Sequence, residues 1–192
     1  MDSFVRPFLL LLLLTPFPAA AGEKAIEILR GSGACPGCML DGADLAGRNL
    51  AGADLSGASL RGADLRRTSL YKADLRDADL RGASLAGASL GQADLSGARL
   101  EGVRMPRARL ARSRLAGASF ANASLPQANL TGADLTRAVF SNADLAGGLL
   151  TNAVLDKADL SGVSLREATL RQLDFSGVAS LAGADCRNAL LY

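Results

Sequence analysis

The chain has 192 residues, a length typical of a single domain, and its 21 Lys and Arg residues against 19 Asp and Glu residues give a formal net charge of +2. That balance is neither strongly basic nor strongly acidic. The chain has no histidine, which excludes the Ser-His and Cys-His pairs of nucleophilic catalysis, and it has no phosphate-binding G-x-x-x-x-G-K-S/T loop. We therefore expect a protein that is not an enzyme and that uses no cofactor or metal.

The first 21 residues have the pattern of a cleavable signal peptide. Arg6 supplies a positive charge, residues 8–14 form an apolar run, and residues 19–21 are the small side chains of a cleavage site. The apolar run is too short to span a bilayer. We expect cleavage after Ala21 and export to the periplasm, the extracellular space or an organelle lumen, with no transmembrane segment in the mature chain.

Residues 22–34 precede the regular part of the chain. Apolar and charged residues are mixed over 23–30 and Gly31 follows them, a pattern that predicts a short helix. Repetitive structures need their open ends covered. We interpret residues 22–34 as an N-terminal cap; a partner-binding helix is the alternative.

An apolar residue recurs at every fifth position from Leu40 to Phe175. Of these 28 positions, 24 are Leu, three are Phe and one is Met105, and a small residue, usually Ala, stands two residues before nearly every one. A period of five would scatter these side chains around a helix, and a strand repeats every two residues. Five is two plus three, so the pattern predicts a three-residue side, with both end residues facing inward, followed by a two-residue corner.

The corner positions support this interpretation. Pro36, Pro106 and Pro126 all occupy the first central position of a corner, which suits a β-turn, and Gly is frequent at the second. Read at twenty-residue spacing, one corner has only Gly or Asn: Gly42, Gly62, Gly82, Gly102, Asn122, Asn142 and Gly162. Four units therefore complete one square coil. Phe120 and Phe140, one coil apart, should stack.

Units such as Ala43–Gly47 and Ala53–Gly57, of the form A-D-L-x-G, resemble the pentapeptide-repeat family over residues 35–191. The resemblance implies an all-β fold, a right-handed quadrilateral β-helix with four pentads per coil. About seven coils, stacked at roughly 4.8 Å, are expected over residues 35–192. The inward phase shifts by one after Phe175, so we expect one extra residue near 176–180, as a bulge at a corner.

Cys35 and Cys38 enclose Pro36-Gly37 in a C-x-x-C motif. A zinc site would need two more ligands, but the chain has no His and one other Cys, the distant Cys186; a thioredoxin-like role would need a βαβ context. The two cysteines end a predicted turn, within reach of a disulfide in an oxidising compartment. We predict a structural disulfide, with free thiols or a redox pair as alternatives. Cys186 is expected to fill a small buried position.

A belt of arginines interrupts the polar residues of the outward positions within one predicted coil. Two hypotheses fit it: a surface that binds an anion or partner, such as an acidic glycan, a lipid headgroup or nucleic acid, or compensation of stacked carboxylates, because Arg99 follows Asp79 by one coil and Arg114 follows Asp94. The belt consists of Arg99, Arg104, Arg107, Arg109, Arg112 and Arg114.

Two exposed apolar surfaces are also expected. Val139, Leu149 and Val154 stand at outward positions and would form one patch. The last coil, which ends at Leu191, has no predicted covering helix, so we expect a homodimer through the C-terminal end.

The sequence therefore predicts a non-catalytic, exported scaffold that binds an unidentified protein or anionic surface. One alternative is an anion-binding protein that uses the arginine belt. The resemblance implies another, because some members of the family resemble duplex DNA and bind type II topoisomerases. The export signal and the lack of acidity oppose that role, and nucleic acid is not expected as a partner.

Overall fold

The computed structural model describes residues 27, 29 and 33–191. Glu27 and Leu29 are helical, Leu29 is buried, and its carbonyl accepts a hydrogen bond from the Gly33 N–H at 3.0 Å. The predicted signal peptide, residues 1–21, and most of the predicted cap, residues 22–34, lie outside the described residues.

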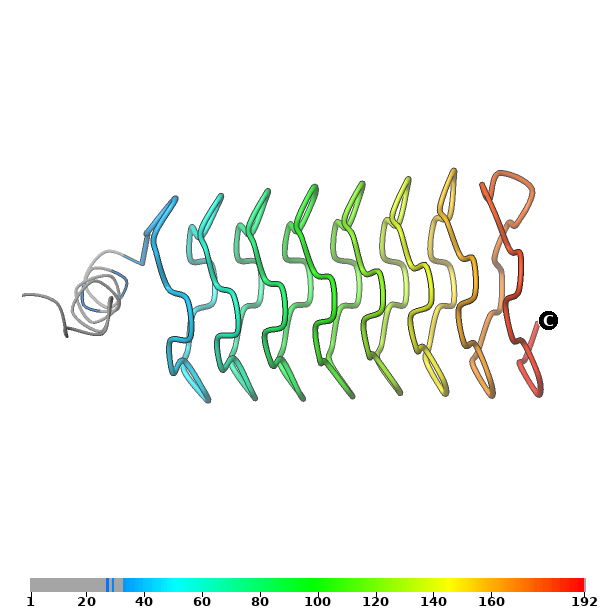
Figure 1. Ribbon diagram of the computed structural model, residues 1–192, viewed down its shortest axis with the longest axis horizontal. Coiled ribbons are helices and arrows are strands. Elements are labelled where there is room, and N and C mark those ends of the chain that lie inside the picture. Colours follow the sequence, from blue (N-terminus) through cyan, green and yellow to red (C-terminus); the bar gives the residue numbers. More distant parts are fainter. Residues whose placement is uncertain (1–26, 28, 30–32, 192) are drawn as a thin grey trace, which may run out of the picture.

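From residue 34 onward the backbone winds into coils stacked along one long axis (Figure 1). Single-residue parallel bridges join each outward residue to the outward residue twenty positions later, from Ala34 with Asp54 to Leu149 with Thr169. Because each side pairs through one residue, the structure contains isolated bridges in place of long strands. Four pentads therefore make one coil, as the sequence predicted.

The bridges sort the outward residues into four columns, which we call sides A to D. Side A presents Ala34, Asp54, Asp74, Asp94, Arg114, Asp134 and Val154. Side B presents Met39, Ser59, Asp79, Arg99, Ser119, Val139 and Asp159. Side C presents Asp44, Asp64, Ser84, Arg104, Ser124, Asp144 and Ser164. Side D presents Asn49, Ser69, Ser89, Arg109, Asn129, Leu149 and Thr169.

The corners are β-turns closed by the expected hydrogen bond, as where the Ala43 N–H donates to the Leu40 carbonyl at 3.1 Å. The second corner residue has positive φ in all four corners of the coil, not only in the corner where Gly and Asn recur. Arg67, Lys72 and Asp77 have φ of 57° to 58°, close to the 66° of Gly42. The backbone hydrogen bonds between coils impose one conformation on the corners from Gly37 to Gln172, so side chains that disfavour positive φ adopt it too.

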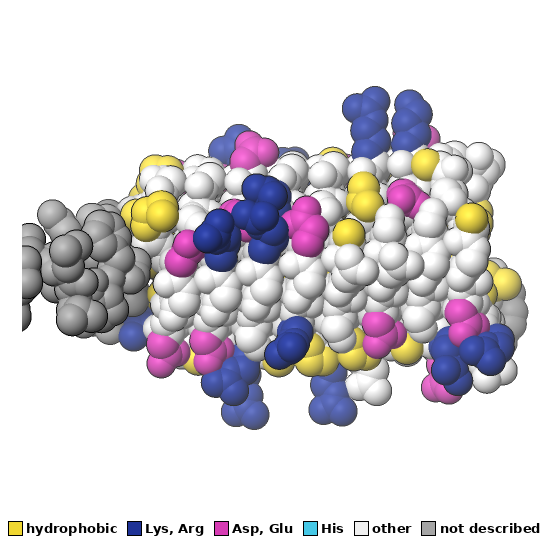
Figure 2. Space-filling model, viewed as in Figure 1, with side chains coloured by type: hydrophobic (Ala, Val, Ile, Leu, Met, Phe, Trp, Pro, Cys, Tyr) yellow, Lys and Arg dark blue, Asp and Glu magenta, His cyan; other side chains and the backbone are white. Residues whose placement is uncertain are grey.

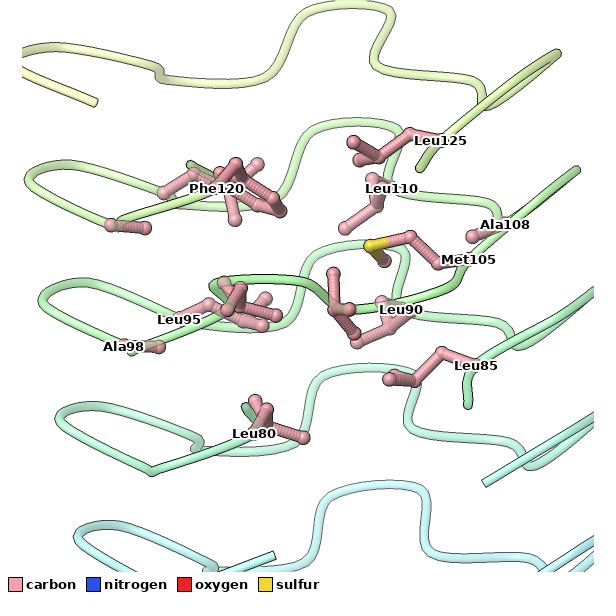
Figure 3. Close-up of a cluster of buried hydrophobic side chains, with 14 of the residues drawn as sticks. Leu80, Leu85, Leu90, Leu95, Ala98, Met105, Ala108, Leu110, Phe120 and Leu125 are labelled. Carbon is pink, nitrogen blue, oxygen red and sulfur yellow. The ribbon is translucent and has the colours of Figure 1, made fainter. Parts of the chain in front are cut away.

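The interior is a set of apolar columns. Leu85, Met105 and Leu125 lie one above another and point into the tube (Figure 3), and all three are fully buried. The rings of Phe120 and Phe140 stack with their centroids 4.7 Å apart, as expected from the spacing. Since Leu, Ala, Phe and Val side chains fill the tube, the protein meets its surroundings only through its sides, corners and ends.

One extra residue shifts the register within 176–180. The Ala179 N–H donates to the Ala158 carbonyl at 2.9 Å, whereas the Ser180 carbonyl accepts from the Leu160 N–H at 2.9 Å, so two consecutive residues face one residue of the preceding coil. This is a β-bulge, after which the bridges join residues 21 positions apart. The irregular stretch includes the corner. The Lys157 N–H donates to the Gly177 carbonyl at 2.7 Å, where a regular corner would use residue 176, and Gly177 lacks the positive φ of the other second corner residues, although the Val178 N–H still closes the turn to the Phe175 carbonyl at 3.2 Å.

The last described coil is exposed at its end. Leu181 and Leu191 occupy inward phases but are 41% and 61% exposed, and Cys186 is exposed as well. The expectation of a buried position for Cys186 is therefore wrong. Its phase is inward, but in the described chain no further coil stacks on it.

Candidate partner-binding surface

Most outward Asp side chains act as backbone caps. Asp44 Oδ1 accepts a hydrogen bond from the Ala46 N–H at 3.1 Å, and Asp54 Oδ1 accepts one from the Ser56 N–H at 3.0 Å, so each carboxylate satisfies the first N–H of the next corner. The same bond is made by Asp64, Asp74, Asp79, Asp94, Asp134, Asp144, Asp159, Asp174 and Asp185. The Asp columns therefore have a structural role in the corners.

Several of these carboxylates also pair with an arginine two residues later. Arg66 Nε donates to Asp64 Oδ1 at 2.8 Å and its Nη2 to Oδ2 at 2.6 Å, and Arg187 binds Asp185 at the same two distances. A guanidinium in this geometry matches both carboxylate oxygens. The spacing D-x-R, which is visible in the sequence, marks these pairs.

The pairing stabilises the ionised form of each carboxyl group. Hydrogen bonds from the Arg187 side chain lower the pKa of Asp185 to about 2. Hydrogen bonds from Arg66, Arg76 and Arg81 likewise lower the pKa values of Asp64, Asp74 and Asp79. The arginines in these pairs are occupied by their own Asp. They offer less to a partner than cations without a carboxylate.

The predicted arginine belt divides into two parts. Arg99 Nη1 lies 3.8 Å from Asp79 Oδ2, and Arg114 Nη1 lies 3.6 Å from Asp94 Oδ2. Each Asp belongs to the preceding coil, as the compensation hypothesis requires. Among the described residues Arg104 and Arg109 have no carboxylate within ion-pair distance. The four outward arginines Arg99, Arg104, Arg109 and Arg114 also lie on four different sides, so a flat partner cannot contact them together.

The two corner arginines of the belt border side D. Arg107 Nε donates to Gln127 Oε1 at 2.8 Å, in the corner between sides C and D. Arg112 lies in the corner between sides D and A, and its Cγ is 3.5 Å from where a Cβ would stand on Gly132, so its side chain extends over the next coil. Both are exposed, and neither forms an ion pair in the described structure.

Side D has no carboxylate at its outward positions. Where sides A to C use Asp to cap the corner, side D uses amides: Asn49 and Asn129 accept the same bond from Ala51 and Thr131 at 3.2 and 3.0 Å. Two corners border side D, one with side C and one with side A. Among the second residues of these corners, between positions 47 and 172, Glu167 is the one carboxylate. Side D therefore retains the hydrogen bond to the first N–H of the corner at these Asn residues, but it has no negative charge at its outward positions.

The predicted apolar patch does not form as one surface. Val139 lies on side B and Leu149 on side D, which are opposite sides of the coil, and Val139 is half-buried. Leu149 and Val154 lie on neighbouring sides and are 41% and 50% exposed. Figure 2 shows one face of the rod, where some Lys and Arg side chains project from the edges and others lie on the face beside Asp and Glu side chains.

The first described coil contains the two neighbouring cysteines. Their sulfur atoms lie within bonding distance, their Cα atoms are 5.4 Å apart, and the Cys38 N–H donates to the Cys35 carbonyl at 3.2 Å, as in the other corners. No group of three or more His, Cys, Asp or Glu residues that could hold a metal ion is found in the part of the chain that the structure describes.

A shallow groove of about 440 Å³ lies along the corner between sides C and D. It contains a serine and three charged side chains, but a Ser-His pair is excluded by the composition. Its lining is Pro126, Gln127, Asp144, Ala146, Gly147, Ser164, Arg166 and Glu167.

Over the described residues, no helix is long and apolar enough to cross a bilayer.

Comparison with known proteins identifies the repeat. A family model described as pentapeptide repeats matches residues 38–77, 73–112, 113–152 and 149–178. The crystal structure of HetL, a pentapeptide repeat protein involved in heterocyst differentiation regulation in the cyanobacterium Nostoc sp. strain PCC 7120, is 32% identical, with 82% of each chain covered and a TM-score of 0.53. QnrB1, a plasmid-mediated fluoroquinolone resistance protein, is 20% identical over 82% of this chain and 84% of its own, with a TM-score of 0.57, and supports the fold alone. No curated protein matches. The chain belongs to the pentapeptide-repeat family, whose members fold as right-handed quadrilateral β-helices.

Proposed function

We propose that the protein is a non-catalytic scaffold that is exported and binds its partner through the outside of the rod. The observation that carries this proposal is the filled interior: the inward columns are buried apolar side chains, so the chemistry available to a ligand lies on four narrow sides and their corners. The regular backbone holds each outward side chain at a fixed place, which favours recognition of an extended or flat partner.

The N-terminal sequence supports export. Residues 1–21 carry the charge, apolar run and small residues of a signal peptide, and Cys35 and Cys38 stand at the distance required for a disulfide, a bond that persists in oxidising compartments. We expect residues 22–34 to cap the first of about seven coils in the exported form. The buried Leu29, which belongs to the core cluster, supports this expectation.

Cell fractionation followed by N-terminal sequencing tests the export. We expect the mature protein in the exported fraction with Gly22 as its first residue. Recovery of the uncleaved chain in the cytoplasm would contradict the proposal. Affinity capture of the mature form from its own compartment then tests the scaffold role, and a turnover of substrate by the purified protein would oppose it.

A DNA-mimicking protein that binds type II topoisomerases is the alternative from the same family. A mimic of duplex DNA would need uninterrupted carboxylate rows, whereas here the Asp side chains cap corners and several are neutralised by arginines at D-x-R. We therefore expect no protection of DNA gyrase from fluoroquinolones by the mature protein. Measured protection would revive the alternative.

A further inference from the structure

We propose that side D and its two corners form a docking surface for an anionic membrane, contacting the lipid headgroups with its flat side. The inference rests on the proposed exported scaffold and names the partner of one of its sides. We call this surface the basic side. The cations at its outward positions and at the second positions of its two corners are Arg67, Lys72, Arg107, Arg109 and Arg112.

The first argument is the placement of cations without a carboxylate. In the described part of the chain, most arginines on sides A to C form an ion pair with an Asp of their own or a neighbouring coil. Arg104 and Arg137 are the exceptions there. Among the described residues, no carboxylate lies within ion-pair distance of the five cations of the basic side, and all five are exposed. Arg107 contacts the neutral Gln127 and Lys72 lies over the Tyr71 ring, so the charge of each cation remains available to a phosphate.

The second argument is the placement of exposed apolar side chains. Leu149 and Leu190 occupy outward positions of side D, and Tyr71 is the first residue of a corner at its edge; they are 41%, 37% and 40% exposed. Aromatic and apolar side chains beside Lys and Arg are the composition of surfaces that lie in a membrane interface. A soluble polyanion would be held by the cations alone.

The third argument is shape. The side positions of D are joined by consecutive parallel bridges, so they lie in one straight column, and the cations occupy two rows separated by two coils, roughly 10 Å along the axis. A bilayer is flat on this scale and can contact both rows together. The full belt of arginines, which encircles the rod, cannot meet one plane.

The experiment is co-sedimentation of the mature protein with vesicles of phosphatidylglycerol and phosphatidylcholine, with phosphatidylcholine vesicles as the neutral reference. We expect binding to the anionic vesicles, weakened by salt, and little binding to the neutral ones. The variant Arg107→Asn, Arg109→Ser, Arg112→Asn should reduce the partition coefficient roughly 100-fold, since each cation near an anionic surface contributes a factor of about five.

The matched control is Arg104→Ser, Arg137→Asn, Lys157→Asn. It also removes one outward arginine and two corner cations, and it changes the net charge equally, but its residues lie on side C and in the corner between sides A and B. We expect the control to bind as the parent does. If both variants lost vesicle binding equally, net charge alone would explain the loss, and the docking surface would be overturned.

Two further measurements separate the remaining outcomes. Leu149→Ser should weaken the binding that persists at high salt, while Val139→Ser on the opposite side should not. Retention of the parent by dextran sulfate without vesicle binding would overturn the membrane proposal in favour of a soluble polyanion. Export with partner capture but no vesicle binding would remove this inference alone and leave the scaffold in place.

Discussion

The rings of Phe120 and Phe140 stack face to face in adjacent coils, with their centroids 4.7 Å apart and their planes within 1° of parallel. The two residues are twenty positions apart, and the other columns of the core contain mainly Leu. Their centroid distance equals the spacing of neighbouring strands, so the backbone register sets the ring contact.

The Phe pair predicts a coupled effect on stability. Phe140→Ala should lower the free energy of unfolding by about 3–5 kcal/mol because it leaves a cavity in a closed column. Phe140→Leu, which restores the residue type of most inward positions, should cost less. A double-mutant cycle of Phe120→Leu and Phe140→Leu, measured by denaturant unfolding, should give a coupling of about 0.5–1.5 kcal/mol. Strict additivity would contradict direct stacking.

The corners predict opposite effects from two single substitutions. Arg137 has φ of 58°, so Arg137→Gly should raise the free energy of unfolding by about 0.5–1 kcal/mol. Gly102 has φ of 65° and open space at its Cβ position, so Gly102→Ala should lower it by about 1 kcal/mol through backbone strain alone. Denaturation midpoints would measure both. Effects of the same sign would be inconsistent with a common corner conformation.

The fold was predictable because one residue type marks each structural position. With Leu at every fifth position and a small residue two positions before it, both residues can be buried only if each pentad forms a short side and a corner. Gly or Asn recurs every twenty residues from Gly42, and this recurrence implied four sides per coil. The conformation at Arg67 was not predictable in this way. Its own preference opposes positive φ, and the hydrogen bonds between coils, which depend on residues twenty apart, determine it.

The candidate site was only partly predictable. The belt was visible as a run of arginines, but its division into paired and unpaired members depends on which Asp lies one coil away. Arg67 and Lys72 were missed because they stand forty residues before Arg107 and Arg112 in the sequence. The stacking of coils places them on the edges of the same side.

The lowered pKa values predict a loss of stability in acid. The Arg81 guanidinium lowers the pKa of Asp79, and Arg99 adds to this, so Asp79 stabilises the fold fully above its unfolded pKa. That contribution is lost as the pH falls through the lower, folded-state pKa. Thermal unfolding between pH 5 and pH 2 should show a declining midpoint, and Asp79→Asn should flatten the decline. An unchanged slope in that variant would contradict the pairing.

The cysteine pair predicts a modest redox effect. A disulfide between Cys35 and Cys38 closes a short loop, so reduction should lower the free energy of unfolding by about 2 kcal/mol at most. Mass spectrometry of the purified exported protein should show a molecule lighter by two hydrogens than the fully reduced chain. Two alkylatable thiols at Cys35 and Cys38 in that sample would show that the bond is absent.

The exposed last coil predicts self-association. Leu181 and Leu191 are apolar, inward in phase and exposed, so two copies should pair end to end at high concentration. Light scattering should show a concentration-dependent dimer, and Leu181→Glu should abolish it, whereas Met39→Glu at the other end of the rod should not. A monomer at all concentrations would remove this expectation.

Each side of the rod depends on residues twenty positions apart lying side by side. Ser69 and Ser89 are joined by a parallel bridge on side D, whereas Ser84 lies on side C. In a Cys186→Ser background, oxidation should cross-link Ser69→Cys with Ser89→Cys but leave Ser69→Cys and Ser84→Cys as free thiols, counted by alkylation and mass spectrometry. A cross-link at fifteen-residue spacing and none at twenty would contradict the quadrilateral coil, and with it the basic side.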